Sequence, residues 1–257
     1  MSGPPTDLRE RCELLRSLHV PGAPLVLPNA WDAASARTVV DAGFPVVATT
    51  SAGVAESLGY EDHELAPREE MLAAAARIAR SVAAPVTVDS EAGYGLDPGE
   101  LVEALREAGA AGCNLEDTDH ATGRLGDPAR QVERLAAIRE AAASRDYPLV
   151  VNARVDVFLL AGGDADPGEL LDEAVARGRS YLAAGADCVY PILLTDGRGI
   201  GAFTKAVGGS VNVIAARGAP PIADLAGLGV ARVSFGPVLY REALAALAER
   251  VAGIRAS

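Results

Sequence analysis

The stretch APVTVDSEAGYGLDPGELVEALREAGAAGCNLED, residues 84–117, contains the unit that predicts the fold. A short apolar run at Val86–Asp89 ends in acidic residues, and a segment of helical period follows at Asp97–Ala108. This segment opens with an Asp-Pro pair and closes before a glycine, which are typical helix start and stop signals. A second apolar run follows at Gly112–Glu116, so the stretch predicts a strand, a helix and another strand.

The same alternation continues along the whole chain. Most of the short runs are apolar throughout, as in parallel strands that are covered on both faces. The eight predicted strands are Leu25–Asn29, Val46–Thr50, Val86–Asp89, Gly112–Glu116, Leu149–Ala153, Cys188–Ile192, Val211–Ile214 and Val233–Phe235. The long predicted helices are Trp31–Asp41, Pro67–Val82, Asp97–Ala108, Asp127–Ser144, Asp166–Ala184 and Pro237–Ala252.

Eight strand–helix units in 257 residues predict an α/β protein with a single (β/α)8 TIM-type barrel over residues 1–257. A further helix is expected near the N-terminus, at about residues 6–19, with His19 on its surface. The alternative is a doubly wound open sheet. Neither a GxGxxG nor a GxxxxGK[ST] phosphate loop follows the first strand, which favours the barrel.

Composition and charge limit the classes of partner. Hydrophobic residues make up 49% of the chain and charged residues 23%, which indicates a sizeable core rather than disorder. The 23 Lys and Arg residues against 35 Asp and Glu residues give a net charge of -12. Because neutralising phosphates requires a basic face, we expect binding neither to nucleic acid nor to an anionic membrane surface.

The N-terminal segment and the cysteines indicate the cellular context. The segment MSGPPTDLRERCELL carries acidic residues and lacks the apolar core of a signal peptide. No run approaches the roughly 20 apolar residues of a membrane helix. Cys12, Cys113 and Cys188 are too scattered for a disulfide framework or a zinc cluster, so we expect a cytoplasmic protein in which Cys113 and Cys188 are small core residues.

Polar side chains gather where the predicted strands end, which is where barrels carry their chemistry. Asp89 and Glu91 follow the third strand and Glu116 ends the fourth, so three carboxylates are expected to converge. Unpaired charges of one sign repel, and oxygen ligands fit Mg²⁺ or Mn²⁺ better than zinc. The alternative is that these acids cap the following helices or pair with arginine.

Two further residues are candidates for the site. Arg154 ends the fifth strand, where a buried guanidinium either clamps a substrate carboxylate or phosphate or pairs with a nearby acid. Both interpretations stay open from the sequence. His120 lies in the loop after the fourth strand, where it could carry a proton for the reaction.

Six segments in order resemble the isocitrate lyase/phosphoenolpyruvate mutase superfamily. VDSEAGYG resembles the D-x-D-x-G-Y-G metal motif of that family with Glu91 in place of the second Asp, CNLED its acidic element and VNARVD its A-R-T-[DE] element. The other matching segments are LPNAWDAASARTVVDAGF, ATTSAGVAESLGYED and VNVIAARGAPPIADLAGLGVARVSFGPVLYREAL.

The resemblance implies a barrel that binds Mg²⁺ and a small anionic 2-oxo acid, stabilises an enolate and forms a homo-oligomer, a dimer or a tetramer. It implies metal-site roles for Asp89, Glu91 and Glu116, with Asp62 closing over the metal. The substrate-binding residues that it implies are Thr50, Ser51, Ala52, Asp89, Arg154 and Asn212. The catalytic candidates are Arg154, Asp62 and His120.

The sequence departs from that family in the lid after the fourth strand. The resemblance implies a K-[KR]-C-G-H lid, whose Cys protonates the enolate in isocitrate and methylisocitrate lyases, whereas this chain has DTDHATGRLGDPARQ. We therefore expect a Mg²⁺-dependent lyase that decarboxylates an oxaloacetate-like acid. The alternatives are P–C bond chemistry on phosphonopyruvate, 2-methylisocitrate-type cleavage and a barrel that binds oxo acids without catalysis.

Overall fold

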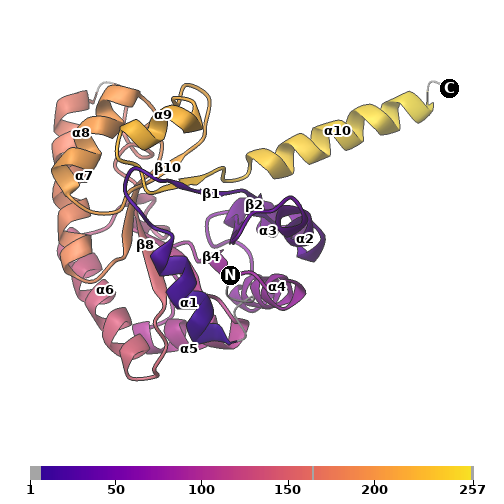
Figure 1. The fold of residues 1–257 in the computed structure, drawn as a ribbon, viewed down its shortest axis with the longest axis horizontal. Coiled ribbons are helices and arrows are strands. Elements are labelled where there is room, and N and C mark those ends of the chain that lie inside the picture. The colour runs from indigo at the N-terminus through magenta and orange to yellow at the C-terminus, as the bar shows by residue number, and fades with distance from the viewer. Residues whose placement is uncertain (1–6, 164, 256–257) are drawn as a thin grey trace.

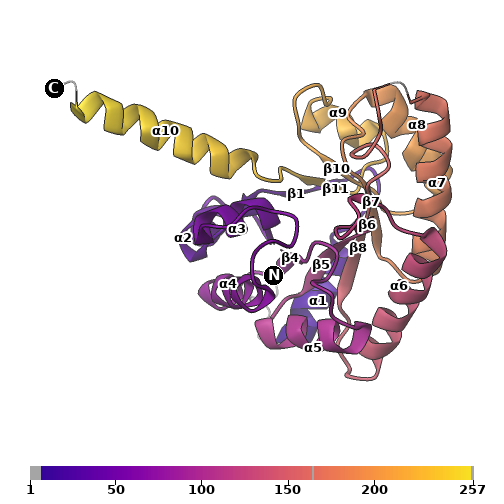
Figure 2. The same ribbon diagram turned by 180° about the vertical axis from the view of Figure 1, so that it is seen from behind.

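The computed structural model describes residues 7–163 and 165–255 and contains a barrel of parallel strands (Figures 1 and 2). A two-stranded antiparallel hairpin, β6 (Thr118–Asp119) and β7 (Arg124–Leu125), follows the barrel strand that ends at Glu116. The barrel strands are β1 (Leu25–Leu27), β2 (Asn29–Ala30), β3 (Val47–Thr49), β4 (Val86–Asp89), β5 (Gly112–Glu116), β8 (Val150–Val155), β9 (Cys188–Pro191), β10 (Asn212–Ile214) and β11 (Arg232–Ser234).

Hydrogen bonding between strands closes the barrel. One sheet runs in the order β2-β3-β4-β5-β8-β9 and the other in the order β1-β11-β10. Only Pro28 separates β1 from β2, and a parallel bridge between Val189 and Val211 links β9 to the start of β10. The predicted barrel is confirmed and the open sheet is excluded, because the last strand, β11, pairs with the first, β1.

Helices cover the outside of this barrel. Those that match predicted segments are α2 (Ala33–Asp41), α4 (Arg68–Ser81), α5 (Pro98–Ala108), α6 (Pro128–Ala143), α7 (Pro167–Ala183) and α10 (Val238–Arg255). The Asp-Pro signals are confirmed, since Asp97, Asp127 and Asp166 accept backbone N–H groups at the starts of α5, α6 and α7. The helices that were not predicted are α3 (Ser51–Leu58), α8 (Gly197–Val207) and α9 (Ile222–Gly227).

The strand register places inward-facing side chains in two layers below the carboxyl end of the barrel. Neighbouring parallel strands turn registered residues to the same side. One layer contains Glu116, Arg154 and Tyr190, which are in register on β5, β8 and β9. The layer beneath it contains Asp89, Asn114, Asn152 and Cys188. Cys113 and Cys188 are buried, as predicted.

The N-terminal helix α1 (Leu8–Ser17) covers the opposite end of the barrel (Figure 1). Its expected start at residue 6 lies outside the described residues. Arg16 donates to the backbone oxygens of Pro148 and Leu149, just before β8. The expectation that His19 is a surface residue is wrong: the chain turns inward after α1, and His19 is buried with its Nδ1 2.8 Å from Leu15 O.

The C-terminal helix α10 extends away from the barrel (Figure 1). A T-shaped contact between Trp31 and Tyr240, with 5.2 Å between ring centroids, anchors its base. Further along, Leu244, Leu247 and Val251 are exposed. Within the described ranges, no helix is both long enough and apolar enough to cross a membrane.

Candidate active site

A polar cavity of about 160 Å³ opens at the carboxyl ends of the barrel strands. In a (β/α)8 barrel, this is the end at which side chains from different strands meet. The predicted site residues that line the cavity are Thr50, Ser51, Ala52, Asp62, Asp89, Glu91, Glu116 and Arg154.

Two predicted site residues lie outside this cavity. Asn212 is fully buried in β10, and its Nδ2 lies 3.3 Å from the Oγ of Ser234, which does line the cavity. His120 lines an adjoining cavity of about 480 Å³ that shares Glu116 with the first. Asn212 therefore lies behind Ser234, and His120 lies at the edge of the site.

The cavity also contains residues that were not among the predicted site residues. Asn114 and Tyr190 line it from inward-facing positions of β5 and β9. Alternation along the predicted strands could have found Asn114, two residues before Glu116, and Tyr190, two residues after Cys188. His63 also lines the cavity but lies in a loop without periodicity, so no sequence signal pointed to it.

Asp89 is joined to the N-terminus of α3. Its Oδ2 accepts the backbone N–H of Ser51 at 3.0 Å, and its own backbone N–H donates to Thr49 Oγ1 at 2.8 Å. A helix N-terminus attracts negative charge, so this position suits a carboxylate. Asp89 Oδ1 is buried and has no hydrogen-bond partner among the described residues.

Glu91 connects two loops with unusual backbone geometry. Its Oε2 accepts the backbone N–H of Glu64 at 2.6 Å, and Glu64 Oε1 accepts the backbone N–H of Tyr94 at 2.5 Å. Glu91, Glu64, Tyr94 and His63 all have positive φ angles, of 47°, 59°, 57° and 70°. Such conformations are costly for residues with a side chain and cluster at functional sites, so the loops are held in place by these bonds.

Burial raises the pKa of Glu91 to about 8. The backbone N–H of Glu64 acts in the opposite direction, whereas the neighbouring carboxylates of Asp62, Asp89 and Glu116 raise the pKa further. Burial and the neighbouring carboxylates thus both favour the neutral form of Glu91.

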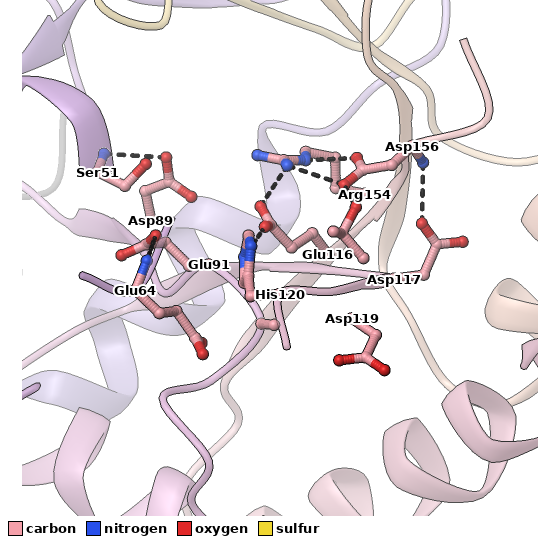
Figure 3. A network of polar contacts seen from close by, with 12 residues as sticks. Ser51, Glu64, Asp89, Glu91, Glu116, Asp117, Asp119, His120, Arg154 and Asp156 are labelled. Carbon is pink, nitrogen blue, oxygen red and sulfur yellow. Dashed lines mark hydrogen bonds and ion pairs between the residues drawn. The ribbon is translucent and has the colours of Figure 1, made fainter. Parts of the chain in front are cut away.

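Arg154 pairs with acids in this structure (Figure 3). Its Nε and Nη2 donate to the two carboxylate oxygens of Asp156 at 2.6 and 2.9 Å, and Nη2 lies 2.5 Å from Glu116 Oε2. Asp156 is itself fixed, because its backbone N–H donates to Asp117 and its carboxylate accepts from Thr118. Of the two interpretations of Arg154, the structure shows the ion pair, formed by a guanidinium that also lines the cavity.

Glu116 lies between Arg154 and His120 (Figure 3). Its Oε1 is 2.5 Å from His120 Nε2. Burial raises the pKa of Glu116 to about 7, although Arg154 and His120 lower it. Contact with Glu116 raises the pKa of His120. The two groups thus form an ion pair at the edge of the cavity when His120 is protonated.

The three predicted metal ligands line one cavity but do not form one ligand group. Asp89 is bound by Ser51, Glu91 by Glu64, and Glu116 by Arg154 and His120. In the part of the chain that the structure describes, no three His, Cys, Asp or Glu side chains are grouped around a possible ion.

The chemistry of the donors nevertheless fits a divalent cation. Asp89 Oδ1 and Asp62 Oδ1 are both buried and lack a hydrogen-bond partner among the described residues. All candidate ligands are oxygens, which Mg²⁺ and Mn²⁺ prefer. A cation here would offset the charge of the neighbouring carboxylates, which adds to the effect of burial on the pKa of Glu91.

The hairpin of β6 and β7 lies within the stretch DTDHATGRLGDPARQ, next to β5 (Figure 2). It carries His120 between its strands and has no cysteine in its sequence. Cys113 is buried in β5, and burial raises the pKa of its thiol to about 12. Its register partners are Val88 and Val151 rather than residues of the cavity, so this thiol does not replace a lid cysteine.

Comparison with known proteins identifies the family. The family model described as phosphoenolpyruvate phosphomutase matches residues 15–255. The chain belongs to this family. It is a member of the PEP mutase/isocitrate lyase superfamily, as is a 2,3-dimethylmalate lyase whose structure superposes with a TM-score of 0.84 at 26% identity, covering 96% of this chain and 88% of that one.

Other relatives of this family member differ in their described activity. A candidate phosphonomutase from Burkholderia cenocepacia J2315 is 42% identical, with a TM-score of 0.90 over 96% of this chain and 99% of that one. An uncharacterized protein of Mycobacterium tuberculosis is 38% identical over 90% of this chain and 84% of its own length. An oxaloacetate decarboxylase of Rhodopseudomonas palustris is 34% identical over 71% of this chain and 63% of its own length.

Proposed function

We propose that this protein is a Mg²⁺-dependent carbon–carbon lyase, formed by one barrel domain, that decarboxylates oxaloacetate or a closely related 2-oxo acid. The observation that carries the proposal is the contact of 2.5 Å between His120 and Glu116. This contact supports a role for the His120 imidazole, which the hairpin carries, as a proton carrier at the cavity edge. Decarboxylation suits this group, because CO₂ leaves before a proton is needed.

The N-terminus of α3 is the proposed site for the substrate carboxylate. The backbone N–H groups of Ser51 and Ala52 and the hydroxyl of Thr50 would receive it, since a helix N-terminus binds anions. In the present structure the backbone N–H of Ser51 donates to Asp89. Substrate binding would therefore replace Asp89 with the substrate carboxylate as the acceptor of this N–H. Arg154 would add positive charge from the opposite wall, and Asn212 would act from behind Ser234.

Asp89, Glu91 and Glu116 would hold Mg²⁺, or Mn²⁺, with Asp62 closing over it. The partnerless oxygens of Asp89 and Asp62 support this assignment. When bound, the cation supplies positive charge that polarises the 2-oxo group and offsets the charge of an enolate.

In the proposed reaction, the bond between the methylene carbon and the distal carboxylate of oxaloacetate breaks, and CO₂ leaves. The electron pair of that bond becomes the carbon–carbon double bond of pyruvate enolate. His120 then donates its proton to the former methylene carbon, which completes pyruvate. Glu116 holds the imidazole in position before and after this transfer.

A panel of substrates tests the proposal. Steady-state rates would be measured with saturating Mg²⁺ on oxaloacetate, 2-methylisocitrate and phosphonopyruvate, for the wild type and for Cys113→Ser. We expect decarboxylation of oxaloacetate, little cleavage of 2-methylisocitrate and no effect of Cys113→Ser. Efficient 2-methylisocitrate cleavage that disappears in the variant would contradict the proposal, as would binding of oxo acids without any turnover.

The similarity to a candidate phosphonomutase favours a second function, P–C bond chemistry on phosphonopyruvate. That substrate has the same 2-oxo acid group and would occupy the same α3 and Arg154 sites. Phosphorus NMR distinguishes the two functions, because breaking the P–C bond shifts the phosphorus resonance whereas decarboxylation leaves phosphonopyruvate unchanged.

We also propose that the protein forms a homo-oligomer through α10. Leu244, Leu247 and Val251 lie three and four residues apart and therefore share one face of this projecting helix. All three are exposed, at 45%, 58% and 55%. A second copy of the chain would cover this apolar face.

A further inference from the structure

Arg232 is a guanidinium buried inside the barrel without a carboxylate partner. It starts β11 and is 1% exposed. Among the described residues the one hydrogen bond of its guanidinium runs from Nη2 to Asn114 Oδ1 at 3.1 Å, while Nε and Nη1 have no partner. Burial lowers the pKa of Arg232, and the charge of Asp89 acts in the opposite direction. Because an unpaired buried charge is costly, stability alone does not account for Arg232.

The hydrogen bonds of Asn114 fix the orientation of its amide. Its Oδ1 accepts from Arg232 Nη2 at 3.1 Å and from Asn152 Nδ2 at 2.8 Å. A carbonyl oxygen has two lone pairs, so both acceptor positions are used. Within residues 7–163 and 165–255, no hydrogen bond from Asn114 Nδ2 is found. Asn114 lines the cavity, so the amide N–H groups are the part left for a ligand.

Carboxylates surround Asn114 in the cavity. Asp89 is in register with Asn114 on the neighbouring strand, and Glu91 and Glu116 lie above it. An ionised carboxylate only accepts hydrogen bonds, and an oxo acid presents only acceptor oxygens. Arg154 and Arg241 are cations that line the cavity; Nε and Nη2 of Arg154 are paired with Asp156 and Glu116, and Arg241 pairs with Glu56. The Asn114 amide is therefore a donor that an oxo acid can reach beside these acids.

We propose that Asn114 donates an amide N–H to an oxygen of the bound 2-oxo acid, and that Arg232 and Asn152 are positioning residues that keep its Oδ1 turned away. This inference rests on the proposed function. A guanidinium can only donate, so it prevents the amide from flipping, and its charge polarises the amide towards stronger donation.

Oxalate binding in the presence of Mg²⁺, measured by calorimetry, tests this role. We expect Asn114→Ala and Arg232→Met each to weaken oxalate binding by about tenfold or more, the size expected for a hydrogen bond to a charged group. Asn152→Ala removes the other donor and is expected to weaken binding less. The control is Thr87→Val, a buried polar residue in β4, which should leave binding unchanged.

Thermal unfolding distinguishes positioning from structural support. Because Arg232→Met replaces a buried unpaired charge with an apolar chain, we expect its Tm to equal or exceed that of the wild type while oxalate binding weakens. Equal oxalate affinity of the wild type, Asn114→Ala and Asn152→Ala would overturn the inference even if Arg232→Met did not fold. A wild type that neither binds oxalate nor turns over any oxo acid would overturn the proposed function itself.

Discussion

Glu91 and Glu64 hold each other's loops beside the cavity. Glu91 Oε2 accepts the backbone N–H of Glu64 at 2.6 Å, and Glu64 Oε1 accepts the backbone N–H of Tyr94, in the loop of Glu91, at 2.5 Å. All three residues have positive φ, so the bonds maintain a backbone that would relax without them. Glu91 stands at the second acidic position of the metal motif, where the family motif has the shorter Asp. Its side chain reaches the backbone N–H of Glu64 and also lines the cavity.

Removing the Glu64 carboxylate should loosen both loops. We expect Glu64→Ala to accelerate amide hydrogen exchange at residues 61–66 and 91–95 and to raise KM several-fold, since one hydrogen bond contributes about 1 kcal/mol. Glu61→Ala is the matched control, because Glu61 is exposed in the same loop. Exchange rates in Glu64→Ala that equal those of the control would show that the loops do not depend on this contact.

Much of the fold could be predicted from the sequence, because strand and helix periods are local signals. The Asp-Pro pairs marked three helix starts correctly. The short helix α8 was missed because its three glycines, at positions 197, 199 and 201, weaken the helix signal.

The candidate site was less predictable, because it depends on contacts between distant segments. The orientation of Asn114 is set by Arg232, 118 residues away. Glu64 lies in a loop without periodicity, so the sequence carried no signal for its role. Whether Arg154 faces a substrate or an acid depends on side-chain geometry, and the structure pairs it with Asp156.

Replacing Arg154 tests its dual contact with Glu116 and Asp156. Lysine keeps the charge but loses the planar arrangement of donors. We therefore expect Arg154→Lys to lower kcat/KM by a factor that corresponds to roughly 2 kcal/mol or more of transition-state binding free energy. Arg139→Lys is the control, since Arg139 pairs with Asp187 and the backbone of Gly185 and Leu149, ahead of β8 and β9. Unchanged kinetics in Arg154→Lys would leave Arg154 with a structural role only.

His19 should make stability depend on pH. Burial and the nearby charge of Arg232 lower the pKa of His19 to about 4 from 6.5, and Arg16 acts in the same direction, against the hydrogen bond to Leu15 and the charge of Asp187. The unfolded chain therefore binds the proton more readily. The stability contributed by neutral His19 is complete above pH 6.5 and is lost as pH falls towards about 4.

Urea unfolding measures this effect. Between about pH 7 and pH 4, His19 should account for a loss of roughly 3 kcal/mol in the free energy of unfolding. His19→Gln removes the titrating group, so its free energy of unfolding should fall less over the same range. Parallel curves for the two proteins would exclude His19 as the cause.

The apolar face of α10 should control oligomeric state. We expect a Leu247→Glu, Val251→Glu double variant to have a smaller mass by light scattering than the wild type, because charges on a buried interface are costly. Ala246→Glu, on the other side of the helix, should keep the mass of the wild type. A wild type that is monomeric at all concentrations would contradict the proposed oligomer.

Asp89 tests the central claim, a metal-dependent decarboxylation at the carboxyl end of the barrel. The measurement is the rate of pyruvate formation from oxaloacetate by the wild type and by Asp89→Asn, each with Mg²⁺ and with EDTA, corrected for the reaction without protein. An Asn side chain keeps one oxygen that can accept the Ser51 N–H. It removes the negative charge of the Asp89 carboxylate, whose Oδ1 has no partner among the described residues. We predict pyruvate formation only by the wild type with Mg²⁺, with both proteins folded. Full activity of Asp89→Asn in EDTA would contradict the claim.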